Sequence, residues 1–108
     1  MSATRSNGRS DAYCEKILRL LRKTYLPEHP YAEFAVYRYN SASVHIRILD
    51  PDFAGMDIPE REDMVWKVLD ELPDPVVQDI SVLLLLPPEE RDAYSLSTEF
   101  DDRSRARL

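Results

Sequence analysis

Apolar residues recur at two different periods along the chain, and these periods predict its elements. Between Asp11 and Tyr25 they follow the i, i+3, i+4, i+7 spacing of one buried helical stripe, formed by Cys14, Ile17, Leu18, Leu21 and Tyr25. Ser10 can cap the start of this helix. Pro27 and Pro30 end it, because proline lacks the amide proton that a helix needs. The pattern therefore predicts a first helix and then a connector.

A period of two follows, which is typical of strands. Residues 33–39 and 43–50 alternate between two faces, and the second segment does so more clearly, with one apolar face formed by Val44, Ile46 and Ile48. Asn40-Ser41-Ala42 separates the two segments, and both asparagine and serine favour turns. We predict an antiparallel hairpin here.

A second helical stripe lies between Pro59 and Leu72 and comprises Val65, Val68, Leu69 and Leu72. Asp57 is suited to cap this helix. Trp66 lies off the stripe, which favours either a partner surface or a cover supplied by the loop or the C-terminal tail. The helix is predicted to end at Pro73.

A third strand is predicted over residues 80–86, with apolar side chains on both faces. One face carries the even positions, from Ile80 to Leu86, and the other carries Leu83 and Leu85. We expect helices of this chain to cover a single face of a three-stranded sheet. Leu83 and Leu85 are therefore expected to pack against a second subunit or against the tail.

The order helix, strand, strand, helix, strand predicts a small α+β domain, with a three-stranded sheet and helices packed on one face of it. The chain has 108 residues, of which 44% are hydrophobic, and this is enough for one such core. The domain is expected to span residues 11–90. A flexible N-terminus, 1–10, and a flexible, charged C-terminal tail, 91–108, are expected on either side of it.

Charge and composition argue against several classes of function. The net charge is −6, and residues 49–79 hold ten acidic and two basic residues, whereas nucleic-acid binders concentrate basic charge on one face. The basic residues of the first helix are expected to form a solvated face: Lys16, Arg19, Arg22 and Lys23. The longest apolar run, 82–86, is too short to span a membrane. With no recognisable signal peptide and a single cysteine, Cys14, a cytoplasmic protein is expected.

Acidic residues around the start of the second helix are the main candidates for chemistry. The carboxylates between Asp50 and Asp63 could bind a divalent cation, although acidic residues are also expected at a helix N-terminus because of the helix dipole. His29 and His45 have no apparent nucleophilic partner, and no phosphate-binding loop or dinucleotide motif is present. The sequence therefore predicts neither a cofactor nor catalytic residues.

A loop, a helix and a strand from Asp52 to Glu90 carry a set of residues at defined spacings: Phe53, Gly55, Arg61, Val65 and Pro88-Glu89-Glu90. In order and spacing these residues resemble the BolA family. The resemblance extends from about Ala12 to Glu90 and implies the KH-like class II topology, α-β-β-α-β. The tyrosine-rich hairpin, 37–43, also resembles a set of short bacterial proteins without an assigned function.

The BolA resemblance implies a partnership with monothiol glutaredoxins around a shared iron–sulfur cluster, which that family binds through a histidine before the last strand. Asp79 stands at that position, and Glu62 replaces the histidine of the family's Arg-His pair. Since these clusters need thiolate or imidazole ligands, we expect no cluster here. Nucleic-acid binding through a KH-type Gly-x-x-Gly loop is also excluded, because the only glycines are Gly8 and Gly55.

We therefore expect a non-enzymatic protein-interaction or regulatory module that binds a protein partner or forms a homodimer. Its interaction surface is predicted to involve Trp66, Arg61, Glu62, Asp79, Leu83 and Leu85. Two alternatives stay open. One is a small metal-dependent factor or enzyme that uses the carboxylates between Asp50 and Asp63. The other is a glutaredoxin-binding protein without the usual cluster ligand.

Overall fold

The structure, a computed structural model, describes residues 11–106, with side chains described up to residue 101. The predicted flexible N-terminus, 1–10, lies outside the described residues. The elements in chain order are α2 (Ala12–Leu20), a π-helical turn (Leu21–Tyr25), β1 (Glu33–Asn40), β2 (Ser43–Leu49), a 3-10 turn (Pro51–Phe53), α3 (Ile58–Leu69), α4 (Asp74–Asp79), β3 (Ile80–Leu86), a second 3-10 turn (Pro88–Glu90) and α5 (Ser95–Ala106). Within the described range, no helix is long and apolar enough to cross a membrane.

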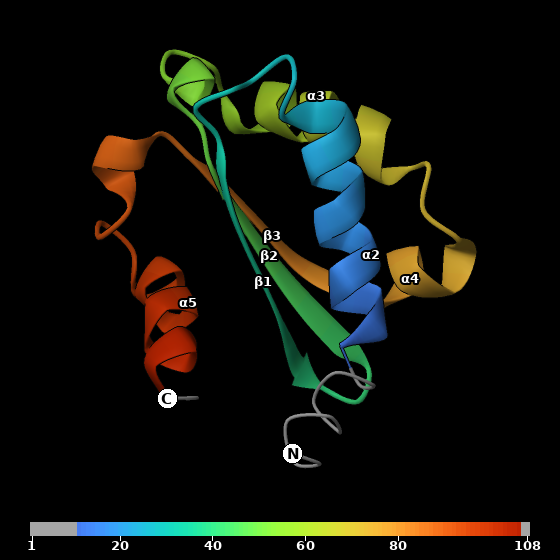
Figure 1. The fold of residues 1–108 in the computed structure, drawn as a ribbon. Coiled ribbons are helices and arrows are strands. Elements are labelled where there is room, and N and C mark those ends of the chain that lie inside the picture. The colour runs from blue at the N-terminus through green and yellow to red at the C-terminus, as the bar shows by residue number, and fades with distance from the viewer. Residues whose placement is uncertain (1–10, 107–108) are drawn as a thin grey trace.

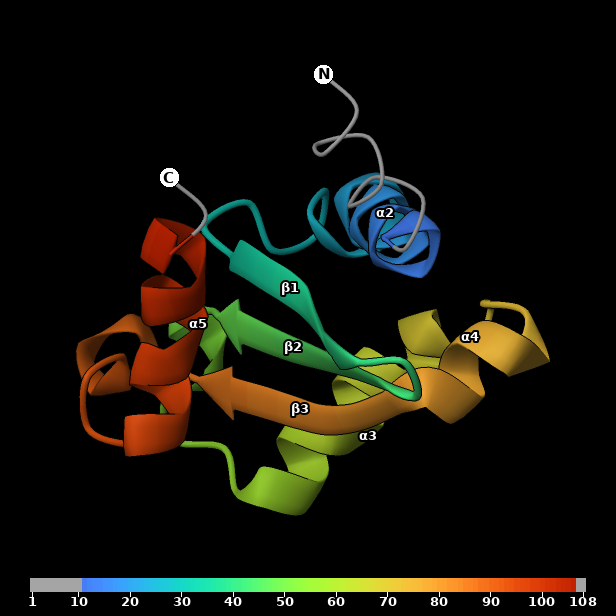
Figure 2. The same cartoon turned by 90° about the horizontal axis from the view of Figure 1, so that it is seen from below.

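The three strands form one mixed sheet in the order β1-β2-β3 (Figures 1 and 2). β1 and β2 pair antiparallel, from Glu33 opposite Leu49 to Asn40 opposite Ser43. β2 and β3 are parallel. The long crossover through α3 and α4 allows this pairing, because a short turn cannot join parallel neighbours. The predicted α+β class with a three-stranded sheet is confirmed.

The main core lies between the sheet and helices α2 and α3. The predicted inner face of β2, formed by Val44, Ile46 and Ile48, is fully buried. The helical side chains that are equally inaccessible to solvent are Ile17, Leu21, Val65 and Leu69. Side chains on these two helices thus cover one face of the hairpin, as the helical stripes predict.

Two local features set the position of α3. Gly55 has a φ of 84°, a left-handed conformation that favours glycine, and it turns the chain from the buried Phe53 toward the helix. A capping box follows: Asp57 Oδ1 accepts from the amide of Glu60 at 3.0 Å, and Glu60 Oε1 accepts from the amide of Asp57 at 2.9 Å. These two carboxylates are therefore used in starting the helix.

The two faces of β3 are the reverse of the prediction. Ile46 pairs with Leu83 and Ile48 with Leu85, so that both leucines lie on the side of α2 and α3. Leu85 belongs to the buried core, and Leu83 packs against it. The prediction of an outward face formed by Leu83 and Leu85 was wrong. Because β3 carries apolar residues on both faces, with Ser81 as its one polar position, alternation in the sequence could not identify its inner face.

Helix α5 covers the other face of the sheet, opposite α2 and α3 (Figure 1). The ring of Phe100 is buried and packs edge-on against Tyr37 of β1, with ring centroids 5.1 Å apart. Arg47 of β2 donates to the carbonyl oxygen of Ser97 at 2.8 Å and to both carboxylate oxygens of Asp101, at 3.1 and 3.0 Å. The sequence predicts helices on a single face, and this is corrected.

The C-terminal segment also differs from the prediction of a flexible tail over 91–108, because residues 95–106 are helical. Ser97 and Phe100 lie one turn apart and both are buried against the sheet. Without this helix, the aromatic ring of Tyr37 and the charge of Arg47 would face solvent. The segment packs against the sheet because its side chains cover the Tyr37 ring and the Arg47 side chain.

Acid is expected to release α5 from the sheet. Hydrogen bonds from Arg47 and then from Arg91 hold the pKa of Asp101 far below its usual range. A carboxyl group with a lowered folded-state pKa stabilises the fold above its unfolded pKa of about 3.9, and this stabilisation is lost as the pH falls below that value. The urea midpoint should therefore fall between about pH 5 and about pH 2.5. Asp101→Asn should show a smaller fall, and an equal fall in both proteins would contradict the assignment.

Candidate functional site

Four of the six residues predicted to form an interaction surface line the same hollow. Arg61 and Glu62 of α3 lie there beside Leu83 and Leu85 of β3, around a volume of about 170 Å³. The other lining residues are Ile58, Leu84, Leu86 and Tyr94. We call this site the β3 hollow. It brings together residues that the sequence separates by more than twenty positions.

The other two predicted residues lie elsewhere. Trp66 is half-buried and packs against the main core, which agrees with a ring that the protein itself partly covers. Asp79 ends α4, and its Oδ2 lies 3.4 Å from Nη1 of Arg38 on β1. This aspartate, predicted from the sequence resemblance to stand where the BolA family has its histidine, is thus used in an ion pair across the end of the sheet.

Arg61 ties α3 to β3 beneath the β3 hollow. Its Nη1 donates to the carbonyl oxygen of Leu85 at 2.8 Å, and its Nε donates to that of Met56 at 3.1 Å. The guanidinium carbon lies 5.9 Å from the ring centroid of Phe53. Because Arg61 is buried by these contacts, it positions the hollow, and the exposed Glu62 supplies the charge at its rim.

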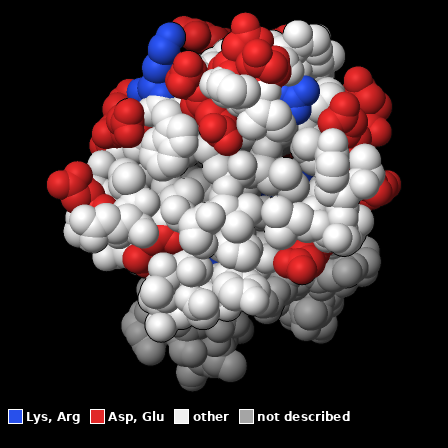
Figure 3. Space-filling view, turned by 180° about the vertical axis from the view of Figure 1, so that it is seen from behind, with Lys and Arg blue, Asp and Glu red and all other residues white. Residues whose placement is uncertain are grey.

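The surface around the β3 hollow is apolar at its centre and acidic around it. Ile58 and Tyr94 line the hollow and are 58% and 50% exposed. Seen from behind, the molecule has a largely uncharged central area whose surround is mostly acidic, with some Lys or Arg side chains at the top (Figure 3). β3 and α3 lie on this side of the molecule, as Figure 2 shows. Exposed apolar side chains gathered beside an edge strand are typical of a binding surface.

A second group of side chains converges at the end of β2. His29 Nδ1 lies 3.2 Å from Oδ2 of Asp50 and 2.7 Å from Oδ2 of Asp52. The Tyr25 hydroxyl donates to Oδ2 of Asp50 at 2.6 Å, and the Tyr25 ring stacks on that of His29, with centroids 4.2 Å apart. Burial, and then the hydrogen bond to Asp50, raise the pKa of Tyr25 far above its usual value, which keeps its hydroxyl a donor.

We call His29, Asp50 and Asp52 the His29 cluster, and it differs from the predicted carboxylate cluster between Asp50 and Asp63. Asp57 and Glu60 cap α3 instead of joining it. His29 was missed because its partners lie more than twenty residues away in the sequence. Pro27 and Pro30, which restrict the connector on either side of it, were the available signal that its position is fixed.

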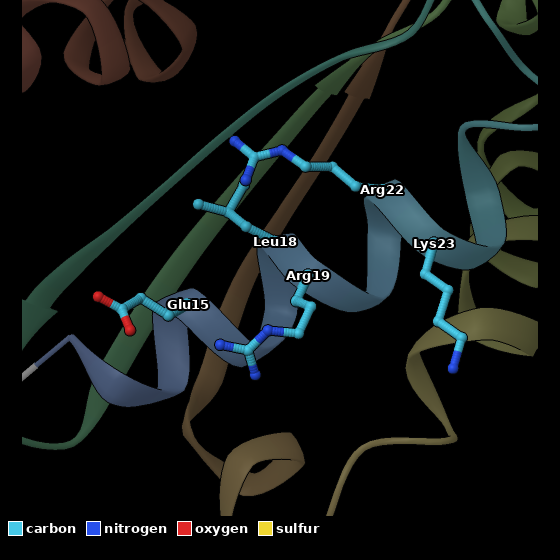
Figure 4. A pocket seen from close by; sticks show the side chains of 5 residues that line it. All are labelled: Glu15, Leu18, Arg19, Arg22 and Lys23. Atoms are coloured by element: carbon cyan, nitrogen blue, oxygen red, sulfur yellow. The ribbon is translucent and has the colours of Figure 1, made fainter.

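The basic residues of α2 and of the π-helical turn that follows it do not form a comparable site. Arg19, Arg22 and Lys23 line an open depression on the helix together with Glu15 and Leu18. Figure 4 shows these side chains fanning out from the helix instead of converging on one point. This arrangement agrees with the predicted solvated helix face.

Comparisons of the chain with family models, with curated proteins and with solved structures find no match. The BolA resemblance accordingly stays a prediction from the sequence, and the geometry of the two sites carries the functional argument.

Proposed function

We propose that this protein is a non-enzymatic interaction module on a BolA-like scaffold, and that it binds an extended, basic segment of a partner protein along β3. The observation that carries the proposal is an apolar edge strand beside a hollow with an acidic surround. Its three components, the outer strand edge, the hollow and the charge, each favour a different property of the partner.

The strand edge favours an extended partner. β3 pairs with β2 on one side, and no other strand in the described part of the chain pairs with it. An edge strand presents backbone N–H and C=O groups that an incoming segment can pair with as an additional strand. The carbonyl oxygen of Leu85 already accepts from Arg61, so a partner strand would pair with the other outward-facing groups of β3. The main-chain hydrogen bonds would supply affinity without requiring a particular sequence.

The β3 hollow favours an apolar side chain in that segment. Its walls include Leu83 and Leu84, together with the exposed side chain of Ile58 and the exposed ring of Tyr94. In strand addition, a hollow beside the edge takes one of the alternate side chains of the added strand, and this contact supplies specificity. A valine, isoleucine or leucine would meet apolar walls on most sides.

The charge around the hollow favours lysine or arginine at the remaining positions. Glu62 lies at the hollow, and Glu89 and Glu90 follow β3 after Pro87 and Pro88. Opposite charges at the rim of an interface speed association with the correct partner, and like charges disfavour other partners. A second copy of this chain fits less well, because a two-fold interface would bring the same acidic residues together from both sides.

A peptide of alternating lysine and valine is the direct probe of this proposal. Titration into the isotopically labelled protein should shift the amide resonances of residues 80–86 and of the first turns of α3. Ile58→Ser and Glu62→Lys should each weaken binding by about tenfold, the equivalent of about 1.4 kcal/mol. Tyr31→Ser is the matched control, because Tyr31 is 78% exposed but does not line the hollow.

A lysine–serine peptide of the same length and charge separates the hollow from simple charge attraction, and it should bind at least tenfold more weakly. Equal binding of the two peptides, or shifts centred on β1, would contradict the proposal. Light scattering provides the other decisive outcome. A concentration-dependent dimer that Ile58→Ser abolishes would assign the edge to a second copy and refute the basic partner.

A further inference from the structure

We propose that His29, Asp50 and Asp52 bind one divalent transition-metal ion at the end of β2, a site separate from the β3 hollow. Each of these residues offers one donor atom, and the three donor atoms lie within 4.8 Å of one another. One imidazole nitrogen and two carboxylate oxygens suit ions such as Zn²⁺ or Mn²⁺.

The distances fit a single ion with little rearrangement. Donor atoms on one tetrahedral Zn²⁺ lie about 3.3 Å apart when each bond is about 2.0 Å. The Nδ1 atom of His29 is 3.2 Å from Oδ2 of Asp50 and 2.7 Å from Oδ2 of Asp52. The carboxylate oxygens of Asp50 and Asp52 also lie within 4.8 Å of each other. Of the two separations from His29, only the one to Asp52 must widen, and Asp52 is the exposed member of the group, with its side chain 58% accessible.

The two less mobile ligands are already oriented. Asp50 is 1% exposed, and its Oδ1 accepts from the amide of Asp52 at 2.9 Å while its Oδ2 accepts from the Tyr25 hydroxyl. The stacked ring of Tyr25 holds the imidazole of His29, with 14° between the ring planes. Metal-binding carboxylates and imidazoles are commonly held by such neighbours, which lower the cost of ordering the site.

The charge of the group also favours a dication. Asp50 and Asp52 are two carboxylates, and His29 is the one basic side chain among the described residues that lies within ion-pair distance of either. Even a protonated His29 would leave one negative charge uncompensated beside a buried carboxylate, which is costly. A bound dication neutralises both carboxylates and leaves the imidazole uncharged.

Three protein ligands leave at least one coordination position for water or for an exogenous ligand. This arrangement is typical of open metal sites, whereas closed structural sites use four protein ligands. The exposed Asp52 places this open position at the surface. The site would therefore exchange metal with solvent and could take a further ligand from a small anion.

Titration calorimetry of the full, chelator-treated chain with ZnCl₂ tests the site. We expect one ion per chain, and we expect binding to weaken at least tenfold in His29→Gln and in Asp52→Asn. Tyr25→Phe removes a group that orients Asp50 and should weaken binding by about tenfold. Asp63→Asn should bind as the native protein does, because Asp63 is an exposed carboxylate outside the group.

Thermal unfolding provides a second readout that does not depend on calorimetric heat. A ligand that binds only the folded state raises the melting temperature, so Zn²⁺ should raise it in the native chain and in Asp63→Asn but not in Asp52→Asn. Since Asp52 is exposed, this variant should fold even if His29→Gln does not.

Three outcomes would overturn the proposal: no heat and no thermal shift up to millimolar Zn²⁺, equal binding by Asp52→Asn and Asp63→Asn, or tighter binding of Ca²⁺ than of Zn²⁺. The last would show an oxygen-only site that does not use the imidazole. None of these outcomes bears on peptide binding at β3, so the two proposals can fail independently.

Discussion

Replacing Asp101 with alanine is expected to lower the free energy of unfolding by about 3 kcal/mol, the lower part of the range for breaking a buried ion pair. The Arg47 side chain is 5% exposed and binds both oxygens of Asp101. Removing the carboxylate leaves the guanidinium buried without a counter-charge, and it also removes the partner of Arg91. Urea denaturation followed by circular dichroism measures the loss.

Asp92→Ala is the matched control for this change, because Asp92 is exposed and lies in the same segment. It should alter stability by less than about 0.5 kcal/mol. Adding Arg47→Met to Asp101→Ala should recover part of the loss, since an apolar side chain avoids the unpaired buried charge. If Asp101→Ala behaves like the control, α5 does not contribute to the stability of the sheet.

Replacing Asp50 with alanine is expected to cost about 3 kcal/mol in metal-free buffer, because two donors lose their acceptor and an unsatisfied buried donor costs about 1–3 kcal/mol. The donors are the hydroxyl of Tyr25, at 2.6 Å, and the amide of Asp52, at 2.9 Å. Tyr25 is 2% exposed, so water cannot readily take the place of the carboxylate. Chemical denaturation in the presence of a chelator measures the change.

A double-mutant cycle isolates the hydrogen bond itself. In the Tyr25→Phe background the hydroxyl is already absent, so Asp50→Ala should cost about 1 kcal/mol less than in the native chain. Asp70→Ala, on an exposed residue after α3, is the control and should have little effect. Strictly additive losses would mean that the two side chains do not interact.

The predictable part of the fold is the part with one apolar face. β2 alternates Val44, Ile46 and Ile48 with polar residues, and α2 has a single apolar stripe, so their buried sides follow from spacing alone. β3 carries apolar residues on both of its faces, so its inner face depends on register with β2. Helix α5 was missed because its packing depends on Arg47, fifty residues away from Ser97.

The β3 hollow could be predicted in part, and the His29 cluster could not. Arg61 and Glu62 were identified from their place in a family-like motif, whereas Ile58 and Tyr94 have no pattern that separates them from other exposed apolar residues. The His29 cluster depends on the path of the connector, which returns His29 to the end of β2. No local spacing encodes that path, because it results from the packing of the Tyr25 ring.

The parallel pairing of β2 with β3 also determines when the core can close during synthesis. The hairpin and α2 leave the ribosome first, but β3 follows only after the whole crossover through α3 and α4. Until then the edge of β2 that pairs with β3 is open, and Ile46 and Ile48 lack their neighbours Leu83 and Leu85. While the ribosome synthesises that crossover, the nascent chain therefore carries an unpaired edge on β2. This is the edge with which β3 later pairs.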